Sequence, residues 1–411
     1  MTEHRHEAGF KDRTRVTAAR EELLAAVEVH GRKSNIAVPD ADGRAVAENI
    51  TAPNPVPGYD RAAVDGFAVR AADSFGASDR SPAILDQEPR GDDTPDQLTP
   101  GGAARVHTGS DMPEGADAVV MIEQVETIGS EVEVFDAVAE GENVGDAGED
   151  VTAGQTLYEQ GHRLRPSDLG LLKSTGIRSV PVFEQPTVGV IPTGEELVQA
   201  EPAPGEIIET NGLTVSQLVK RWGGSATYRN VVTDNKAALR AAIERDRTKD
   251  LIVTTGGSSV GERDLLPEVV SDLGEVLVHN VALKPGHPVC LGRVGDTPVL
   301  SLPGYPVACI VNAFQFLRPA LKRAGGMPVE PHPTHEATLE RKISSDPGER
   351  TFVRVGLTET DDGLRATPTR ASGSGVLSSV ALADGWVVVP ESREGFGTDE
   401  TVTVEIWEPG Q

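Results

Sequence analysis

The chain has no long apolar run, and this absence excludes a class of protein. No segment of its 411 residues approaches the uninterrupted apolar length that a membrane-spanning helix requires. The first residues, MTEHRHEAGFKDR, lack the apolar core of a signal peptide. We therefore expect a cytoplasmic protein with no membrane partner.

Cysteine is nearly absent. The two cysteines, Cys290 and Cys309, both lie in apolar runs and show no metal-ligand spacing. Two such residues cannot build a disulfide framework of the kind found in small secreted domains. Because free cysteine behaves as a small hydrophobic residue, buried structural thiols are favoured over reactive ones.

Basic residues are scarce, and lysine is especially rare. The chain has 64 acidic residues against 38 basic ones, of which nine are lysines, and its formal net charge is −26. Such a charge opposes binding to nucleic acid, so no nucleic-acid partner is expected. Abundant acid combined with scarce lysine favours a halophilic archaeal source over an ordinary acidic surface. At about 1 M salt the Debye length is roughly 3 Å, so an anionic substrate is not repelled at long range.

The length and the pattern of the segments predict a multidomain α/β protein. Residues 1–53 and 143–182 are expected to form an elongated linker domain, with a mainly-β domain inserted at 54–142. Residues 183–326 alternate strands with helices, which is typical of a doubly wound, mostly parallel sheet with helices on both faces. Residues 327–411 contain short alternating strands and are predicted to form a small β-barrel-like domain, with a sandwich as the alternative.

Polar and proline residues mark the helix ends of the central segment. Asn211 and Asn235 suit helix N-caps, because an asparagine side chain can accept a hydrogen bond from the first helical turn. Pro319 is expected to kink the last helix of this segment, since proline has no N–H to donate.

Polar loops follow the predicted central strands. In an open parallel sheet, ligands bind in the crevice beyond the carboxyl ends of the strands. The loops expected to meet at that edge are 192–196, 233–234, 254–264, 284–288 and 303–306. The sequence therefore predicts one site built from distant parts of the chain.

The loop TTGGSSVG, which begins at Thr254, has the chemistry of an anion site. Its donors are the backbone and hydroxyl groups of Gly256, Gly257, Ser258 and Ser259, placed just before a predicted helix. A structural tight turn explains the same residues equally well. Lys284 favours anion binding because a rare lysine lies between an apolar strand and Pro-Gly. His287 can add a further contact or be an ordinary loop histidine.

Carboxylates supply the other half of the expected site. Glu196, Asp234 and Asp264 all lie on the predicted loops. Acidic side chains beside a phosphate cradle suit Mg²⁺, which takes a few carboxylates together with substrate oxygens. The alternative is that each acid merely caps a helix. Three acids on one edge favour the metal, so we predict that these three residues bind Mg²⁺.

In combination, the motifs resemble those of the molybdopterin molybdenumtransferases, the family of MoeA and the gephyrin E domain. The similar segments are AAVDGFAVR (62–70), GEDVTAG (148–154), PTGEEL (192–197), TNGLTVSQLV (210–219), TTGGSSVGERD, LKPGHP and SLPGYPVA. The resemblance extends from about residue 16 to the C-terminus. TTGGSSVG alone is shared with the related molybdopterin adenylyltransferases, so the combination of motifs is what distinguishes the family.

The resemblance implies an activity and an assembly. The expected enzyme inserts molybdate into adenylylated molybdopterin, uses Mg²⁺, and releases AMP together with the molybdenum cofactor. The expected assembly is an elongated homodimer, in which the active cleft lies between the central domain of one subunit and the Asp65-bearing domain of the other. Molybdopterin adenylyltransferase and molybdoenzyme apoproteins are the further partners it implies.

The resemblance also implies roles for single residues. The acidic positions of the family fall on Asp65, Asp150, Glu196, Asp234 and Asp264. Asp150 is expected to bind substrate, and the other four are expected to be catalytic. The contacts to pterin, phosphate and molybdate are implied for Lys284, Pro303, Pro306, Arg350 and Ser374.

Several positions depart from the family pattern. The usual Ser-x-Met before Asp-Gly is Ala62-Ala63-Val64, a common second lysine is Asn280, and Tyr305 and His287 replace an asparagine and a lysine. Fewer basic groups around an anionic pterin can weaken binding or change which oxyanion is chosen, so tungstate is an alternative to molybdate. Two other functions also remain open. The first is a molybdopterin adenylyltransferase, against which the large flanking domains count. The second is a non-catalytic dimeric scaffold, which would not explain why the acidic residues are retained.

Overall fold

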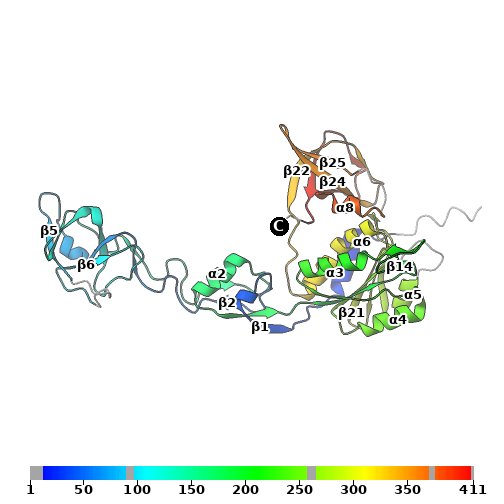
Figure 1. The fold of residues 1–411 in the computed structure, drawn as a ribbon, viewed down its shortest axis with the longest axis horizontal. Helices are drawn as coiled ribbons and strands as arrows, with labels where there is room; N and C mark the ends of the chain where they lie inside the picture. Colours follow the sequence, from blue (N-terminus) through cyan, green and yellow to red (C-terminus); the bar gives the residue numbers. More distant parts are fainter. Residues whose placement is uncertain (1–12, 89–96, 257–264, 370–374, 409–411) are drawn as a thin grey trace, which may run out of the picture.

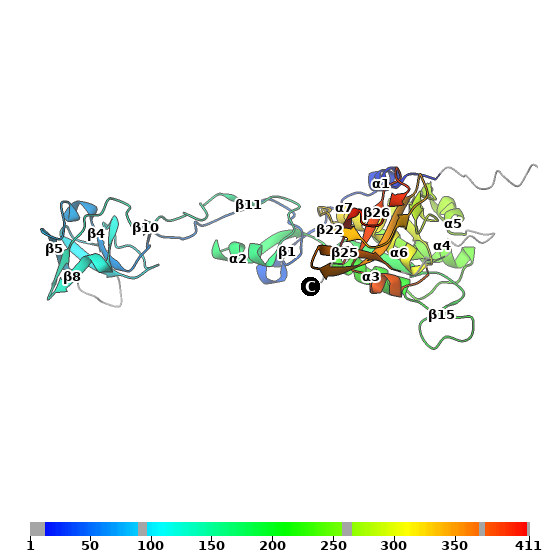
Figure 2. The ribbon, with the colours of Figure 1, turned by 90° about the horizontal axis from the view of Figure 1, so that it is seen from above.

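The computed structural model describes residues 13–88, 97–256, 265–369 and 375–408. The molecule is elongated (Figure 1): a small β unit lies at one end, a linker unit in the middle, and a central α/β unit with a C-terminal barrel at the other end. Figure 2 shows the same extended arrangement from above. In these ranges, no helix is both long enough and apolar enough to cross a membrane.

The linker unit is built from two separate chain segments. Its elements are β1 (Lys33–Ala37), η1 (Val38–Asp40), β2 (Ile50–Thr51), β11 (Thr156–Tyr158), α2 (Pro166–Ser174) and β12 (Ser179–Phe183). β1 pairs antiparallel with β12, and β2 pairs with β11. The chain therefore passes through this unit on its way to the small β unit and again on its return.

The small β unit is a six-stranded sheet with the order β7-β4-β6-β5-β9-β8. The strands are β4 (Gly66–Val69), β5 (Ala83–Gln87), β6 (Gly102–Val106), β7 (Ala118–Met121), β8 (Val125–Ile128) and β9 (Glu131–Val134), with short helices η2 (Ala71–Ser74) and η3 (Ile122–Gln124). Val132 and Val134 of β9 are buried, whereas Glu131 is exposed and Glu133 is only partly buried, as alternation along a strand requires. Before and after the sheet, β3 (Arg61–Ala62) pairs with β10 (Val144–Gly145).

The central unit holds a mixed six-stranded sheet with the order β16-β13-β17-β21-β20-β18. The strands are β13 (Thr187–Pro192), β16 (Ser225–Tyr228), β17 (Leu251–Thr255), β18 (Glu275–His279), β20 (Cys290–Val294) and β21 (Thr297–Leu302). The first four strands in this order pair in parallel, whereas β20 and β18 pair antiparallel at one edge. The parallel part therefore has a single carboxyl edge.

Helices cover both faces of this sheet. Val188 and Val190 of β13 belong to a core shared with α1 (Val16–Ala25), α3 (Asn211–Arg221), α6 (Pro306–Asn312) and α7 (Arg318–Ala324). Ile191 and Ile252 belong to the opposite core, shared with α4 (Lys236–Arg245) and α5 (Leu265–Leu273). Alternate residues of each strand thus face different helix layers. Cys290 and Cys309 are both buried, as the sequence predicted.

Only one of the two predicted asparagine caps is present. The Asn235 side chain accepts a hydrogen bond from the Ala238 N–H at 2.8 Å and caps α4. Asn211 is instead the first residue of α3, whose N-cap is Thr210. Its side-chain amide donates to the Gly304 carbonyl at 2.7 Å, so the cap prediction for Asn211 is wrong. The amide binds a neighbouring loop instead of its own helix.

Pro319 changes the geometry of the last central helix. Immediately before it, η4 (Ala313–Leu317) is a π-helix, in which the Arg318 N–H bonds to the Ala313 carbonyl five residues back. Because Pro319 has no N–H, it cannot bond to the Gln315 carbonyl four residues back. Arg20 of α1 binds that carbonyl instead, through Nε at 3.0 Å.

The C-terminal unit is a closed five-stranded barrel, as the sequence predicted. The ring consists of β22 (Thr334–Leu339), β24 (Arg350–Thr360), β25 (Gly363–Pro368), β26 (Gly385–Val389) and β28 (Thr401–Glu405), and β26 closes it by pairing with β24. β23 (Ile343–Ser344), β27 (Gly395–Phe396) and α8 (Ser378–Ala381) complete the unit. Trp386 packs against Phe314 of the central unit, with ring centroids 5.3 Å apart.

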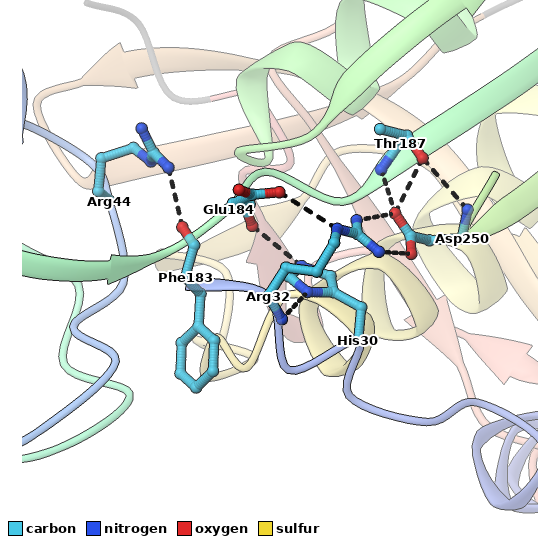
Figure 3. A network of polar contacts seen from close by, with 7 residues as sticks. All are labelled: His30, Arg32, Arg44, Phe183, Glu184, Thr187 and Asp250. Carbon is cyan, nitrogen blue, oxygen red and sulfur yellow. Dashed lines mark hydrogen bonds and ion pairs between the residues drawn. The ribbon is translucent and has the colours of Figure 1, made fainter. Parts of the chain in front are cut away.

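A charged joint ties the linker unit to the central unit (Figure 3). Arg32 lies just before β1, and its guanidinium donates to both carboxylate oxygens of Asp250, at 2.9 and 2.7 Å. The same group donates to Glu184, which follows β12. Asp250 also accepts hydrogen bonds from the N–H and hydroxyl of Thr187, at 2.7 and 2.9 Å. The two chain crossings between these units are therefore fixed to each other.

Candidate functional site

The carboxyl ends of the parallel strands bring several loops into contact. The Gly194 N–H donates to the Val232 carbonyl at 3.2 Å, and the Gly256 N–H donates to the Leu302 carbonyl at 3.1 Å. A side chain at Gly256 would place its first carbon 2.1 Å from the Thr193 carbonyl oxygen, so this close approach requires glycine. We call the segments 192–196, 232–234, 255–256 and 302–306 the strand-end rim. Their contact agrees with the convergence expected from the sequence.

Two of the predicted acids lie together on this rim. Asp234 is half-buried, and burial raises the pKa of its carboxyl, as do the negative charges of Glu196 and then Glu195, while the Thr193 hydroxyl opposes the rise. Within the described ranges, Asp234 Oδ1 is buried and has no hydrogen-bond partner. The glutamates are exposed. The rim therefore concentrates negative charge around a buried oxygen that, among the described residues, accepts no hydrogen bond of ordinary geometry.

The arrangement fits a cation better than it fits helix capping. Asp234 does not cap α4, because Asn235 does. A buried carboxylate oxygen without a donor is costly unless a cation or a proton binds it. Mg²⁺ is commonly held by one or two carboxylates together with substrate phosphate oxygens, and Glu196 and Asp234 supply two. Across the part of the chain that the structure describes, no group of three or more acidic, histidine or cysteine side chains forms a metal cluster.

Several predicted site residues lie outside the described residues. These are Gly257, Ser258, Ser259, Asp264 and Ser374. Gly256, the first glycine of the predicted anion loop, is described and lies on the strand-end rim.

Lys284 and Arg350 are neighbours on the barrel sheet. Lys284 lies on β19 (Leu283–Lys284), which pairs in parallel with β24 so that Leu283 is opposite Arg350. The Lys284 ammonium bonds to Asp346 at 2.7 Å, and Arg350 pairs with Glu391 at 3.2 Å. Because Lys284 is opposite Thr351, the register places the Lys284 and Arg350 side chains on opposite faces of the paired strands. The expectation that loop 284–288 follows a strand of the central sheet is wrong, because β19 adds its hydrogen bonds to β24.

The loop after Lys284 packs against α6, the helix that begins at the rim. Asn312 of α6 donates from Nδ2 to the Gly286 carbonyl at 2.9 Å. A side chain on Gly286 would meet that amide at 2.2 Å, so the loop packs tightly on the helix. Burial, followed by the charge of Arg13, lowers the pKa of His287. Since α6 begins at Pro306, the loop lies against the helix that starts at the rim.

The 303–306 loop presents one aromatic ring to solvent. Pro303 is buried, and Pro306 is the first residue of α6. Tyr305 between them is 62% exposed. A first side-chain carbon on Gly375 would lie 3.4 Å from the Tyr305 ring, so the barrel unit approaches the rim here. Tyr305 therefore places an aromatic ring where two units meet.

Asp65 lies at the far end of the molecule from the rim. It follows β3, in the small β unit (Figure 1), and it accepts hydrogen bonds from the N–H and hydroxyl of Thr108, at 2.7 and 2.9 Å. Those bonds lower the pKa of the Asp65 carboxyl, with the backbone bond contributing most. Asp150 is exposed on the connection back to the linker unit, where its N–H bonds to the Val56 carbonyl. A single chain does not bring either acid to the rim.

Sequence reasoning missed residues that support the site. Thr108 holds Asp65, and the segment HTGS after an apolar strand was the available signal. Glu209 is buried just before α3, and Asn211 binds the 303–306 loop. The motif TNG marked this helix start, but its side-chain partners lie too far away in sequence to be read from the pattern.

Comparisons with known proteins cover almost the whole chain. Three family profiles match in succession: "MoeA N-terminal region (domain I and II)" over residues 14–176, "Probable molybdopterin binding domain" over 189–323, and "MoeA C-terminal region (domain IV)" over 336–407. The order and extent of these matches follow the units described above.

Individual relatives match over similar lengths. A molybdopterin molybdenumtransferase of Bacillus subtilis is 34% identical over 386 residues, which is 91% of this chain and 90% of that protein. A putative molybdopterin biosynthesis protein of Methanocaldococcus jannaschii is 34% identical over 397 residues, or 94% of this chain and 95% of that one. A crystal structure of a molybdopterin biosynthesis MoeA protein from Pyrococcus horikoshii has a TM-score of 0.85 at 34% identity, covering 97% of this chain and 100% of that chain.

Proposed function

Because the chain belongs to the molybdopterin molybdenumtransferase family, transferases of molybdenum cofactor biosynthesis, we propose a specific reaction and site for it. The protein inserts molybdate into adenylylated molybdopterin, with Mg²⁺-dependent release of AMP. Tungstate is an alternative oxyanion. The supply of substrate by a molybdopterin adenylyltransferase and delivery to molybdoenzyme apoproteins belong to the same proposal.

The observation that carries the proposal is the acidic pair on the strand-end rim. Asp234 Oδ1 is buried without a donor among the described residues, beside the negative charge of Glu196. Burial and like charge disfavour this carboxylate unless a cation binds. Glu196 and Asp234, together with Asp264, are the residues that would hold Mg²⁺. When bound, the ion supplies Lewis-acid stabilisation of charge that develops on the leaving phosphate.

The remaining groups position the substrate. The backbone N–H groups of Gly257, Ser258 and Ser259, which lie outside the described residues, would hold phosphate, since donors before a helix favour an anion. Lys284 and Arg350 attract the anionic pterin and the oxyanion. The side chains of Lys284 and Asp346 are both exposed, so their ion pair is weak. A substrate oxygen can therefore replace the Asp346 carboxylate as the partner of Lys284. Catalysis in this scheme comes from positioning and electrostatics.

A second subunit completes the site in this proposal. Asp65 cannot reach the rim of its own chain, because the linker unit separates the two (Figure 1). A homodimer with two-fold symmetry places the small β unit of each subunit beside the central unit of the other. Asp65, held ionised by Thr108, then orients the nucleophile or the metal.

The surface charge supports a high-salt cytoplasm. With a net charge of −26, the chain repels itself strongly at low ionic strength. Salt near 1 M reduces the Debye length to roughly 3 Å and removes most of that repulsion. We therefore propose a halophilic archaeal source, with activity that rises as salt increases.

A defined assay tests the reaction. The protein is incubated with adenylylated molybdopterin, Mg²⁺ and either molybdate or tungstate, and AMP release and metal incorporation are followed. We expect both products to form with wild-type protein, and to be lost in Glu196→Gln and Asp264→Ala, which remain folded. Glu206→Gln is the matched control, because Glu206 is exposed on a nearby loop. Absence of AMP, or full activity in Asp264→Ala, would contradict the proposal.

A further inference from the structure

A buried glutamate behind the strand-end rim has no part in the chemistry above. Glu209 precedes α3 and is only 5% exposed. The Tyr228 hydroxyl donates a hydrogen bond to its Oε2, and the Gly212 N–H donates to its Oε1 at 2.6 Å. A buried carboxylate is tolerated when donors satisfy it, and here each oxygen has one. These two hydrogen bonds hold the Glu209 carboxylate in one position behind the rim.

The donor at Gly212 links this glutamate to the helix start. N–H groups in the first turn of a helix have no partner within the helix, so an outside acceptor fixes the position of that turn. The carboxylate is such an acceptor, and a negative charge is favourable at the positive end of the helix dipole. Glu209 thus orients the first turn of α3.

The first turn of α3 contacts two loops of the rim. A first side-chain carbon on Gly212 would lie 2.7 Å from Pro192 Cγ, so the turn packs directly against the 192–196 loop. Asn211 donates from Nδ2 to the Gly304 carbonyl at 2.7 Å and so holds the 302–306 loop. A shift of the turn would therefore move both loops together.

We propose that Glu209 is a positioning residue for substrate binding. It fixes the first turn of α3 and, through Asn211, the 302–306 loop, in the arrangement that accepts the phosphate-bearing substrate. Tyr228 supports it from β16 by donating to the second carboxylate oxygen. The inference rests on the function proposed above, because it concerns the same site.

Steady-state kinetics with four variants test the role. In Glu209→Ala the KM for adenylylated molybdopterin rises roughly 10- to 100-fold, the size expected for loss of a charge-assisted hydrogen bond, while kcat changes less. Glu209→Gln keeps an acceptor for Gly212 and restores KM to within about threefold. Asn211→Ala raises KM in the same direction as Glu209→Ala. Glu206→Gln, an exposed acid on the preceding loop, leaves KM unchanged.

Hydrogen exchange separates this inference from the proposed reaction. Amide exchange is measured for segments 210–214 and 302–306 in wild type, Glu209→Ala and Tyr228→Phe. We expect both segments to exchange faster in the two variants, while the opposite edge of the sheet, 275–279, is unchanged. This readout remains valid if the wild-type protein releases no AMP, a result that would sink the proposed reaction alone. Unchanged exchange, an unchanged KM in folded Glu209→Ala, or no rescue by glutamine would overturn the role of Glu209.

Discussion

At the scale of single residues, Asp234 shows a conflict between stability and function. Burial and the negative charges of Glu196 and Glu195 raise the pKa of its carboxyl, and among the described residues its Oδ1 has no hydrogen-bond partner. A raised carboxyl pKa means that the folded state prefers the protonated form. The stability that the protonated group contributes is present below the ordinary pKa of aspartate and is lost as pH rises.

We predict that Asp234→Asn stabilises the metal-free protein at neutral pH and removes its activity. The stabilisation should disappear below about pH 4, where the wild-type carboxyl is protonated in both states. Turnover should fall roughly 100-fold or more, as when a group that stabilises developing charge is lost. Denaturant unfolding at several pH values, with and without Mg²⁺, measures the first effect. A variant less stable than wild type at pH 7 would contradict this account of the carboxylate.

The stability of the protein should also fall at acid pH because of His332, for a different reason. Burial, reinforced by the charge of Arg318, lowers its pKa from 6.5 to about 4. The ring lies 5.4 Å from Phe314 and 6.4 Å from Trp386, between the central and barrel units. A lowered histidine pKa stabilises the fold above 6.5, and this stability is lost as pH falls toward 4.

We expect His332→Gln to flatten the stability profile between pH 6.5 and 4. The wild-type protein should lose up to about 3 kcal/mol across this interval through His332, and the variant should lose correspondingly less. Trp386 fluorescence can follow unfolding of this interface. An identical pH dependence in both proteins would show that His332 does not carry the effect.

At the scale of elements, the π-helix before Pro319 depends on a partner from another helix. Arg20 satisfies the Gln315 carbonyl that Pro319 leaves without a donor. We predict that Arg20→Met lowers the free energy of unfolding by about 1–3 kcal/mol, because a buried carbonyl loses its hydrogen bond. Arg15→Met, on an exposed residue at the start of α1, should have little effect. Equal stability of both variants in urea unfolding would refute this account of Arg20.

Element order and the rim were accessible from the sequence, because local patterns encode them. Apolar strands such as Leu251–Thr255 alternate with amphipathic helices, and loops at parallel strand ends must meet. This was enough to place Glu196 and Asp234 together. Short alternating strands also predicted a small β-barrel or sandwich, and the pairing of β26 with β24 shows that the barrel is closed.

Features that depend on long-range pairing were not accessible. β19 looks like another strand of the central sheet, but its partner is β24, almost seventy residues later. Glu209 has no distinctive local pattern, and its role depends on Tyr228 from a different strand. Asn211 resembles a cap because nothing in the sequence shows that Gly304 lies within its reach. Side-chain partners distant in sequence require the fold.

At the scale of the whole molecule, the charged joint keeps the long arm in a defined direction. Asp250 is 11% exposed in its side chain, whereas Arg32 is 44% exposed. Hydrogen bonds to Arg32 and Thr187 outweigh burial and lower the pKa of the Asp250 carboxyl. A lowered pKa contributes stability above the ordinary aspartate value, and this is lost as pH falls through the lowered value.

We predict that Asp250→Ala destabilises the protein by about 2–4 kcal/mol at pH 7, because Arg32 and Thr187 lose their acceptor. Arg32→Ala should cost about 1 kcal/mol or less, since its guanidinium is half-exposed. Small-angle scattering should show a wider range of arm directions in Asp250→Ala. Equal scattering profiles for the variant and the wild type would exclude the joint as the element that directs the arm.

The most direct test of the account mixes two inactive proteins. Asp65→Asn lacks the acid of the small β unit, and Asp234→Asn lacks the acid of the strand-end rim. If each site combines the two acids from different subunits, a mixed dimer keeps one intact site of two. An equimolar, fully exchanged mixture should then release AMP at about a quarter of the wild-type rate. Activity no greater than that of the separate variants would contradict a site shared between subunits.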